Sequence, residues 1–247
     1  MSFSLRQGLA SSFKLAELIF FPSLCKLCSN LLEIPREKIV CRSCLQVIQP
    51  HRTSYCLSCG KFFSGSGEPH YCRRCVEQRP AFSYHRSCGL YTGKLKDIIL
   101  LYKYRGFSVL GEFLAEFIVR SLGKEESLWW KTDAIIPVPL HSEKEKERGF
   151  NQAQILAKEL ARRKQIPLIG DQLVKVKRTL PQTSLEAKER ENNLKGAFEV
   201  RDREKIRGKI VLLVDDVFTT GSTLQECSLA LKAAGALEVR ALTVAQA

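Results

Sequence analysis

Residues Val211–Thr223 read VLLVDDVFTTGST: four aliphatic side chains, then two carboxylates, then a small and hydroxyl-rich segment. Four aliphatic residues in succession predict a central strand of a parallel sheet, because such a strand is buried on both faces. Beyond Thr223 the apolar residues fall largely on one side of a helix, which predicts an amphipathic helix packed on that sheet. The stretch therefore indicates a strand–loop–helix unit of an α/β fold.

The segment after this strand has the chemistry of a sugar-phosphate site. Backbone N–H groups of small residues can close around a phosphate at the positive end of a helix. Asp215 and Asp216 would repel a phosphate, but carboxylates accept hydrogen bonds from sugar hydroxyls and bind Mg²⁺. We therefore expect a phosphorylated sugar beyond the end of this strand; the alternative is a buried strand followed by an ordinary capped helix. The phosphate-binding candidates are Thr219, Thr220, Gly221, Ser222 and Thr223.

Eight of the ten cysteines form an internal repeat with a period of 31 residues. Each repeat has two CxxC knuckles separated by twelve residues, the spacing of a closed tetrahedral Cys₄ zinc site. We expect two structural Zn²⁺ ions, one per repeat; an interleaved pairing of knuckles and an iron–sulfur cluster are the alternatives. Gly60 supplies the left-handed turn that such a knuckle often needs. The predicted ligands are Cys25, Cys28, Cys41 and Cys44 in one repeat and Cys56, Cys59, Cys72 and Cys75 in the other.

Length and charge bound the partners of this chain. The 247 residues predict a small N-terminal module over residues 1–80, consisting of a helix and the two zinc ribbons, and a larger α/β domain over residues 81–247. The formal net charge of +13 falls to about +9 with two Zn(Cys)₄ sites, so the chain stays basic. A basic chain favours acidic partners such as nucleotides, phosphosugars or nucleic acid, although a basic surface is also common without them.

The metal-type cysteine spacing argues for reduced thiols and a cytoplasmic protein. The N-terminus lacks the features of a signal peptide, and no apolar run approaches the ~20 residues of a membrane span.

Further strands are expected at residues 84–91, 134–138, 173–177 and 197–200, with an edge strand at 238–244 and a polar, flexible loop at 141–147. Lys103, Tyr104 and Arg105 place two cations around an aromatic ring at a helix end. This arrangement suits single-stranded nucleic acid, while the alternative is a solvated helix end. Arg148 precedes a predicted helix and can contact a pyrophosphate, while the alternative is a surface arginine near a helix start.

Val211–Thr223 resembles the signature by which type I phosphoribosyltransferases bind phosphoribosyl pyrophosphate (PRPP). The resemblance implies that Asp215 and Asp216 bind the ribose hydroxyls and Mg²⁺, and that residues 219–223 hold the 5′-phosphate. It also implies the fold of that family, a parallel sheet flanked by helices.

The order of motifs along the chain is similar to that of the ComF competence family. These motifs are the cysteine repeat, the KYRG segment, PVP, RGFNQ and the PRPP signature. The resemblance implies a role in DNA uptake, with PRPP and single-stranded DNA as candidate ligands and competence or recombination proteins as candidate partners. It also suggests Arg148, Arg178 and Lys103 as contacts to the pyrophosphate. A conventional phosphoribosyltransferase of nucleotide metabolism and a non-catalytic PRPP-sensing regulator are the alternatives.

Overall fold

The structure is a computed structural model that describes residues 23–32, 39–65, 67–104, 106–122, 125–177 and 194–247. The chain divides into two compact units, residues 1–49 and residues 50–247. The second cysteine tetrad therefore belongs to the same compact unit as the sheet, whereas the domain boundary after residue 80 stays a prediction. The helix expected within residues 1–22 lies outside the described residues.

Each compact unit contains one cysteine ribbon, and the two ribbons repeat the same hydrogen bonds. The N–H of Cys25 donates to the carbonyl of Asn30 at 2.8 Å, and the N–H of Cys56 donates to that of Lys61 at 2.8 Å. Each second knuckle opens a short helix, α2 (Arg42–Gln46) in the first unit and α3 (Arg73–Glu77) in the second. The sequence repeat is therefore also a structural repeat.

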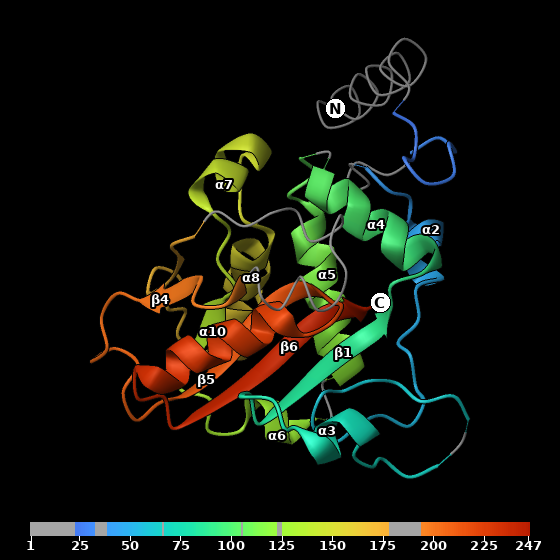
Figure 1. Cartoon of the computed structure of the whole chain (residues 1–247). Coiled ribbons are helices and arrows are strands. Elements are labelled where there is room, and N and C mark those ends of the chain that lie inside the picture. Colours follow the sequence, from blue (N-terminus) through green and yellow to red (C-terminus); the bar gives the residue numbers. More distant parts are fainter. Residues whose placement is uncertain (1–22, 33–38, 66, 105, 123–124, 178–193) are drawn as a thin grey trace, which may run out of the picture. The chain divides into compact units, whose positions relative to one another are not determined.

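The core of the second unit is a parallel sheet of four strands in the order β1-β6-β5-β2 (Figure 1). The final strand was expected at an edge, and that expectation is wrong: β6 pairs with β1 on one side and with β5 on the other. Its apolar residues are buried on both faces, as a central strand requires. The strands are β1 (Tyr84–Leu90), β2 (Ala134–Pro137), β5 (Ile210–Phe218) and β6 (Glu238–Gln246).

Helices cover both faces of this sheet (Figure 1). The apolar side of α10 (Ser222–Ala233), with Leu224 and Leu231, shares a buried cluster with Val211 and Leu213 of β5. The helices α5 (Leu110–Leu122) and α8 (Gln152–Lys164) pack together on the other face. Two further helices of the described part of the chain are α4 (Gly93–Tyr104) and α6 (Glu126–Trp129).

Two segments outside the main sheet complete the described elements. The strands β3 (Leu173–Lys175) and β4 (Phe198–Val200) form a separate antiparallel pair. The loop expected at residues 141–147 is instead a helix, α7 (Ser142–Arg148). Capping at both ends favours a helix over a loop here. The His141 side chain accepts a hydrogen bond from the N–H of Glu143, and Gly149 takes the left-handed conformation after the last turn.

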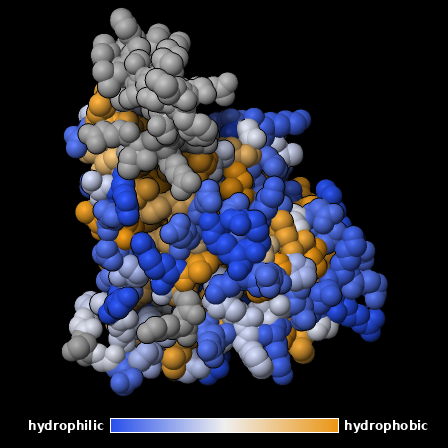
Figure 2. All heavy atoms as spheres, turned by 180° about the vertical axis from the view of Figure 1, so that it is seen from behind, coloured by the Kyte–Doolittle hydropathy of each residue, from blue (hydrophilic) through white to orange (hydrophobic). Residues whose placement is uncertain are grey.

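Hydrophilic side chains cover much of the face that is opposite to the view of Figure 1, with hydrophobic side chains in smaller groups between them (Figure 2). Among the described residues, no helix is both long enough and apolar enough to cross a membrane.

Gly60 sits where the second ribbon meets strand β1. Its φ of 67° confirms the predicted left-handed turn, but Ser29 holds the equivalent position in the first ribbon at a φ of 60°. Conformation alone therefore does not require glycine at this turn. The close approach does, because a Cβ on Gly60 would lie 2.4 Å from the carbonyl oxygen of His85.

We expect Gly60→Ala to lower the free energy of unfolding of the zinc-loaded protein by about 1–3 kcal/mol, since the new Cβ forces the ribbon away from β1. Denaturant unfolding measures the change. Gly65→Ala is the matched control, because Gly65 also has a positive φ but nothing lies within 4 Å of its added Cβ. Equal losses in the two variants would show that the close approach contributes nothing.

Candidate functional site

The two carboxylates predicted to bind a sugar lie in the last part of strand β5. Asp216 is buried, and its Oδ1 forms an ion pair with the Nζ of Lys103 at 2.6 Å. Asp215 is half-buried, and its Oδ1 accepts a hydrogen bond from the N–H of Asp216 at 2.8 Å. The structure therefore brings Lys103, from the end of α4, to the carboxylates that were predicted separately from it.

The electrostatics of this cluster make a second negative charge costly. Burial, reinforced by the charge of Asp216, raises the pKa of Asp215 to about 7, although Lys103 acts in the opposite direction. Burial lowers the pKa of Lys103, but the Asp216 carboxylate more than offsets this and holds the pKa above its usual value. At neutral pH, Lys103 and Asp216 thus form a charged pair beside a carboxyl group that readily takes up a proton.

The predicted phosphate loop leads from β5 into α10. Gly221 has a φ of 83°, and a Cβ there would lie 2.9 Å from the ring of Phe218, so the loop requires glycine at this position. The hydroxyls of Thr220 and Ser222 lie 2.8 Å apart, and helix α10 begins at Ser222. The loop therefore places hydroxyl groups at the N-terminal end of a helix, as the sequence predicts, with Thr219 exposed and Thr223 in the first turn.

A second group of predicted residues meets around Gln152, which the sequence did not single out. The guanidinium of Arg148 donates to Gln152 Oε1 at 3.0 Å and lies 5.0 Å from the ring centroid of Tyr104. The hydroxyl of Tyr102 donates to the Gln152 carbonyl at 2.7 Å. The RGFNQ motif contained this glutamine, but its role depends on the packing of α8 against α4. Arg105 and Arg178, two further predicted site residues, lie outside the described residues.

Both cysteine tetrads have the geometry of a zinc site. The Sγ atoms within each tetrad lie within 4.8 Å of one another. Sulfur pairs are separated by 4.0 Å for Cys25 and Cys44, and by 3.8 Å for Cys59 and Cys72. A tetrahedron with Zn–S bonds of 2.3 Å has edges of about 3.8 Å. The grouping is one tetrad per repeat, as expected, and four thiolates leave no open position for catalysis.

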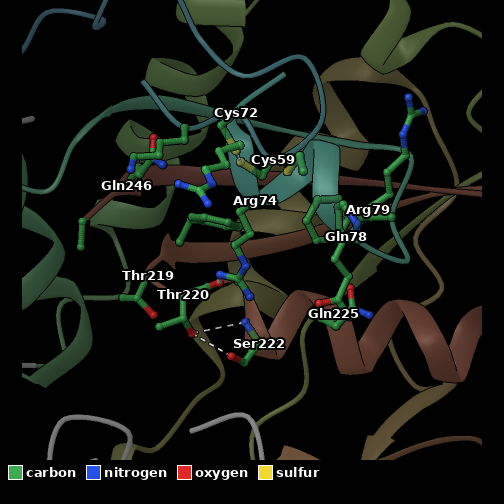
Figure 3. Close-up of a pocket in the computed structure, with 18 residues that line it drawn as sticks. Cys59, Cys72, Arg74, Gln78, Arg79, Thr219, Thr220, Ser222, Gln225 and Gln246 are labelled. Carbon is green, nitrogen blue, oxygen red and sulfur yellow. Dashed lines mark hydrogen bonds between the residues drawn. The ribbon is translucent and has the colours of Figure 1, made fainter. Parts of the chain in front are cut away.

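The second ribbon also contacts the phosphate loop, through residues that the sequence did not mark. Arg74 Nη1 donates to the carbonyl of Thr220 at 3.1 Å (Figure 3). Below the loop, His85 stacks on Phe218 with ring centroids 4.2 Å apart, and its Nδ1 lies 2.8 Å from the carbonyl oxygen of Cys59. The loop is thus held between the ribbon and the sheet.

Two family models match this chain. Residues 110–247 match the phosphoribosyl transferase domain, and residues 17–76 match the double zinc ribbon domain. Competence protein F of Haemophilus influenzae is 33% identical over 92% of this chain and 99% of its own length. The chain belongs to the ComF family.

Other members of this family have different names. The DNA utilization protein YhgH of Salmonella typhimurium is 31% identical over 89% of this chain and 95% of its own length. Competence protein ComFC of Bacillus subtilis is 29% identical over 77% of this chain and 76% of its own length. The matches confirm the predicted fold class, a phosphoribosyltransferase-like parallel sheet flanked by helices together with an N-terminal zinc-ribbon module.

The raised pKa of Asp215 predicts a pH-dependent cost of folding. The unfolded carboxyl ionises near pH 4, whereas the folded one ionises near pH 7, so the wild type loses stability as the pH rises through this window. Asp215→Asn removes this loss of stability, because an asparagine side chain does not ionise. Between pH 6 and pH 8, denaturant unfolding without ligand is expected to show the variant gaining about 1 kcal/mol relative to wild type.

Asp216→Asn is the contrasting control, because it leaves Lys103 buried without its partner and should destabilise the protein across the same pH range. An Asp215→Asn difference that stays constant with pH would contradict the raised pKa.

Each ribbon is expected to bind one zinc ion independently of the other. Cys25→Ser with Cys28→Ser, or Cys56→Ser with Cys59→Ser, should lower the zinc content from two ions per chain to one, as measured by elemental analysis. Loss of both ions from either double variant would contradict separate sites. We expect only the second variant to lower the stability of the sheet, because only the second tetrad lies in the sheet's compact unit.

Proposed function

We propose that this ComF-family chain is a cytoplasmic protein of DNA uptake that binds PRPP with Mg²⁺ and also binds single-stranded DNA. The observation that carries the proposal is the carboxylate pair beside a glycine–hydroxyl loop at the carboxyl end of a central strand. The names of the relatives, competence protein F and DNA utilization protein YhgH, support the link to DNA. Competence or recombination proteins are the corresponding protein partners.

In this proposal the carboxylates of β5 and the loop that follows them bind different parts of PRPP. Asp215 and Asp216 accept hydrogen bonds from the ribose hydroxyls and offer oxygen ligands to Mg²⁺. The N–H groups and hydroxyls of residues 219–223 hold the 5′-phosphate. Arg148 and Arg178 contact the pyrophosphate, and Lys103 keeps Asp216 paired in the free protein.

Catalysis by this site would be displacement at ribose C1. The bond from C1 to the pyrophosphate oxygen breaks, pyrophosphate leaves with the electron pair, and an acceptor lone pair forms the new bond to C1. Mg²⁺ would neutralise charge on the leaving pyrophosphate. Cationic side chains such as Arg148 would stabilise the same charge, because pre-positioned charges act most strongly where charge develops. A protein that binds PRPP without turnover would use the same contacts up to bond cleavage.

The proposed DNA contact lies at the end of α4. Tyr104 is 62% exposed, and the Arg148 guanidinium lies over its ring. An exposed aromatic ring with neighbouring cations suits stacking with an unpaired base and contact with its phosphate. Lys103 contributes less charge to this surface than the sequence suggested, because its ammonium group pairs with Asp216.

Titration calorimetry with PRPP and Mg²⁺ tests the proposal. Asp215→Asn with Asp216→Asn should weaken PRPP binding about 100-fold or more, because two or more charge-assisted hydrogen bonds are lost. The zinc content should stay at two ions per chain. Asp97→Asn, an exposed carboxylate on α4, is the control and should bind like wild type. Unchanged affinity in the double variant would refute the site.

Pyrophosphate release, measured with PRPP, Mg²⁺ and a panel of bases and DNA strands, separates an enzyme from a binding protein. Turnover with a free base would favour a conventional phosphoribosyltransferase, and binding without release would favour a sensor.

A further inference from the structure

A cavity of about 390 Å³ lies between the second zinc ribbon and the phosphate loop (Figure 3). One wall is made by residues 72–75 at the start of α3, and the opposite wall by residues 219–222. This volume is in the range of small-molecule binding sites. Asp215 and Asp216 do not line it, so it is a space beside the proposed ribose site rather than the same space.

Four cationic side chains and three thiol groups of the second tetrad line this cavity. Lys61, Arg73, Arg74 and Arg79 line it, and no acidic side chain does so among the described residues. Arg73 is largely neutralised, since it pairs at 2.8 Å with Glu77 on the surface. Arg74 reaches across to the Thr220 carbonyl, and Arg79 lies over the ring of Tyr71. With Zn²⁺ bound, the tetrad whose Cys59, Cys72 and Cys75 line the cavity carries a net charge of about −2, so the other three cations leave the lining at about +1. Their guanidinium and ammonium groups can still bind a phosphate through charge-assisted hydrogen bonds.

The first ribbon shows that the zinc fold itself does not need these cations. The positions 31 residues before Lys61, Arg74 and Arg79 are occupied by Asn30, Ser43 and Ile48, all uncharged. Most of the main-chain hydrogen bonds around the first tetrad nevertheless recur at the equivalent positions around the second. Three positive charges have therefore been placed on the copy of the ribbon that faces the loop, for a reason other than holding metal.

The rest of the cavity offers what a nucleobase recognises. Gln225 and Gln246 lie at its border, and their Oε1 atoms accept hydrogen bonds from the N–H groups of Ala81 at 2.8 Å and Phe62 at 3.2 Å. These bonds fix the amide planes and orient their NH₂ groups as donors. Phe82 and Phe218 are the aromatic residues of the lining, although each is almost wholly buried. Cations for a phosphate, fixed amides and apolar surface together fit a nucleotide.

We propose that this cavity is a nucleotide-binding site, in which Arg74, Arg79 and Lys61 hold the phosphate and the Gln225 and Gln246 amides contact the base. The nucleotide is either a free mononucleotide or the terminal unit of a single strand, since both present the same chemistry. The inference deepens the proposed function, on which it rests for the link to nucleic acid, by assigning the second ribbon to ligand binding. The shared loop then places this nucleotide next to PRPP.

The test replaces the three cations by the residues that the first ribbon carries. Lys61→Asn, Arg74→Ser and Arg79→Ile are combined in one chain, and binding of deoxythymidine monophosphate and of a 5′-phosphorylated oligothymidylate is measured. We expect at least a tenfold loss of affinity for one or both probes. The control removes three exposed charges from the turn before β5, by Arg201→Ser, Arg203→Ser and Lys205→Asn, and should change affinity less than twofold.

The two probes distinguish the source of the nucleotide. A loss for both supports a site for free nucleotides, and a loss for the oligonucleotide alone supports a site for a strand end. Wild-type affinity of the triple variant for both probes, equal losses in variant and control, or the absence of binding by the wild type would overturn the proposal. Arg79→Ile alone, which leaves the contact from Arg74 to Thr220 intact, should show a smaller loss in the same direction.

A failure here is distinguishable from a failure of the proposed function. Asp215→Asn with Asp216→Asn tests PRPP binding and leaves the cation-lined cavity unchanged, so nucleotide binding should persist in that variant.

Discussion

The need to compensate two adjacent carboxylates at the end of a buried strand shapes this molecule. An unpaired carboxylate in such a place costs several kcal/mol, so a cation must lie close to it. Lys103 meets that need for Asp216, while burial keeps Asp215 ready to take up a proton. The end of helix α4 therefore has to lie near the carboxylates of β5. Tyr104, the last residue of this helix, is exposed to solvent beside Arg148.

The second ribbon is built into this arrangement rather than attached to it by a linker alone. Gly60 allows its knuckle to touch the β1 backbone, and the buried His85 bonds to both Cys59 of that knuckle and Thr243 of β6. His85 also stacks on Phe218, whose ring lies against Gly221 in the phosphate loop. Since packed cores deform little, a change in the position of the ribbon is expected to shift the loop.

The local parts of this structure were readable from the sequence, whereas the long-range contacts were not. The strand–loop–helix at residues 211–223 and the tetrad grouping follow from short-range patterns, and both are present. The central place of β6 was missed, because a strand's neighbours depend on the whole topology. Helix α7 was missed because its many charged residues suggested a loop, although its caps favour a helix.

Three of the contacts that define the site join distant segments and have no sequence signal of their own. Lys103 with Asp216, Arg74 with Thr220 and Arg148 with Tyr104 each link residues far apart in the chain. Lys103 was interpreted as a nucleic-acid contact because its immediate neighbours are aromatic and basic. The fold also brings its ammonium group to the Asp216 carboxylate at 2.6 Å, a contact that no local sequence pattern encodes.

The metal constrains only part of each ribbon, so the second ribbon can carry charges that the first lacks without loss of the fold. Four thiolates around one ion supply most of the stability of so small a segment, so side chains outside the tetrad are free to change. The two copies keep the metal-ligand positions and most of the main-chain bonds around them, yet they differ by three cations on one surface. Those cations face the phosphate loop in the compact unit that contains the sheet. Cations at positions that the metal leaves unconstrained, next to the loop that is predicted to bind phosphate, fit an anionic ligand.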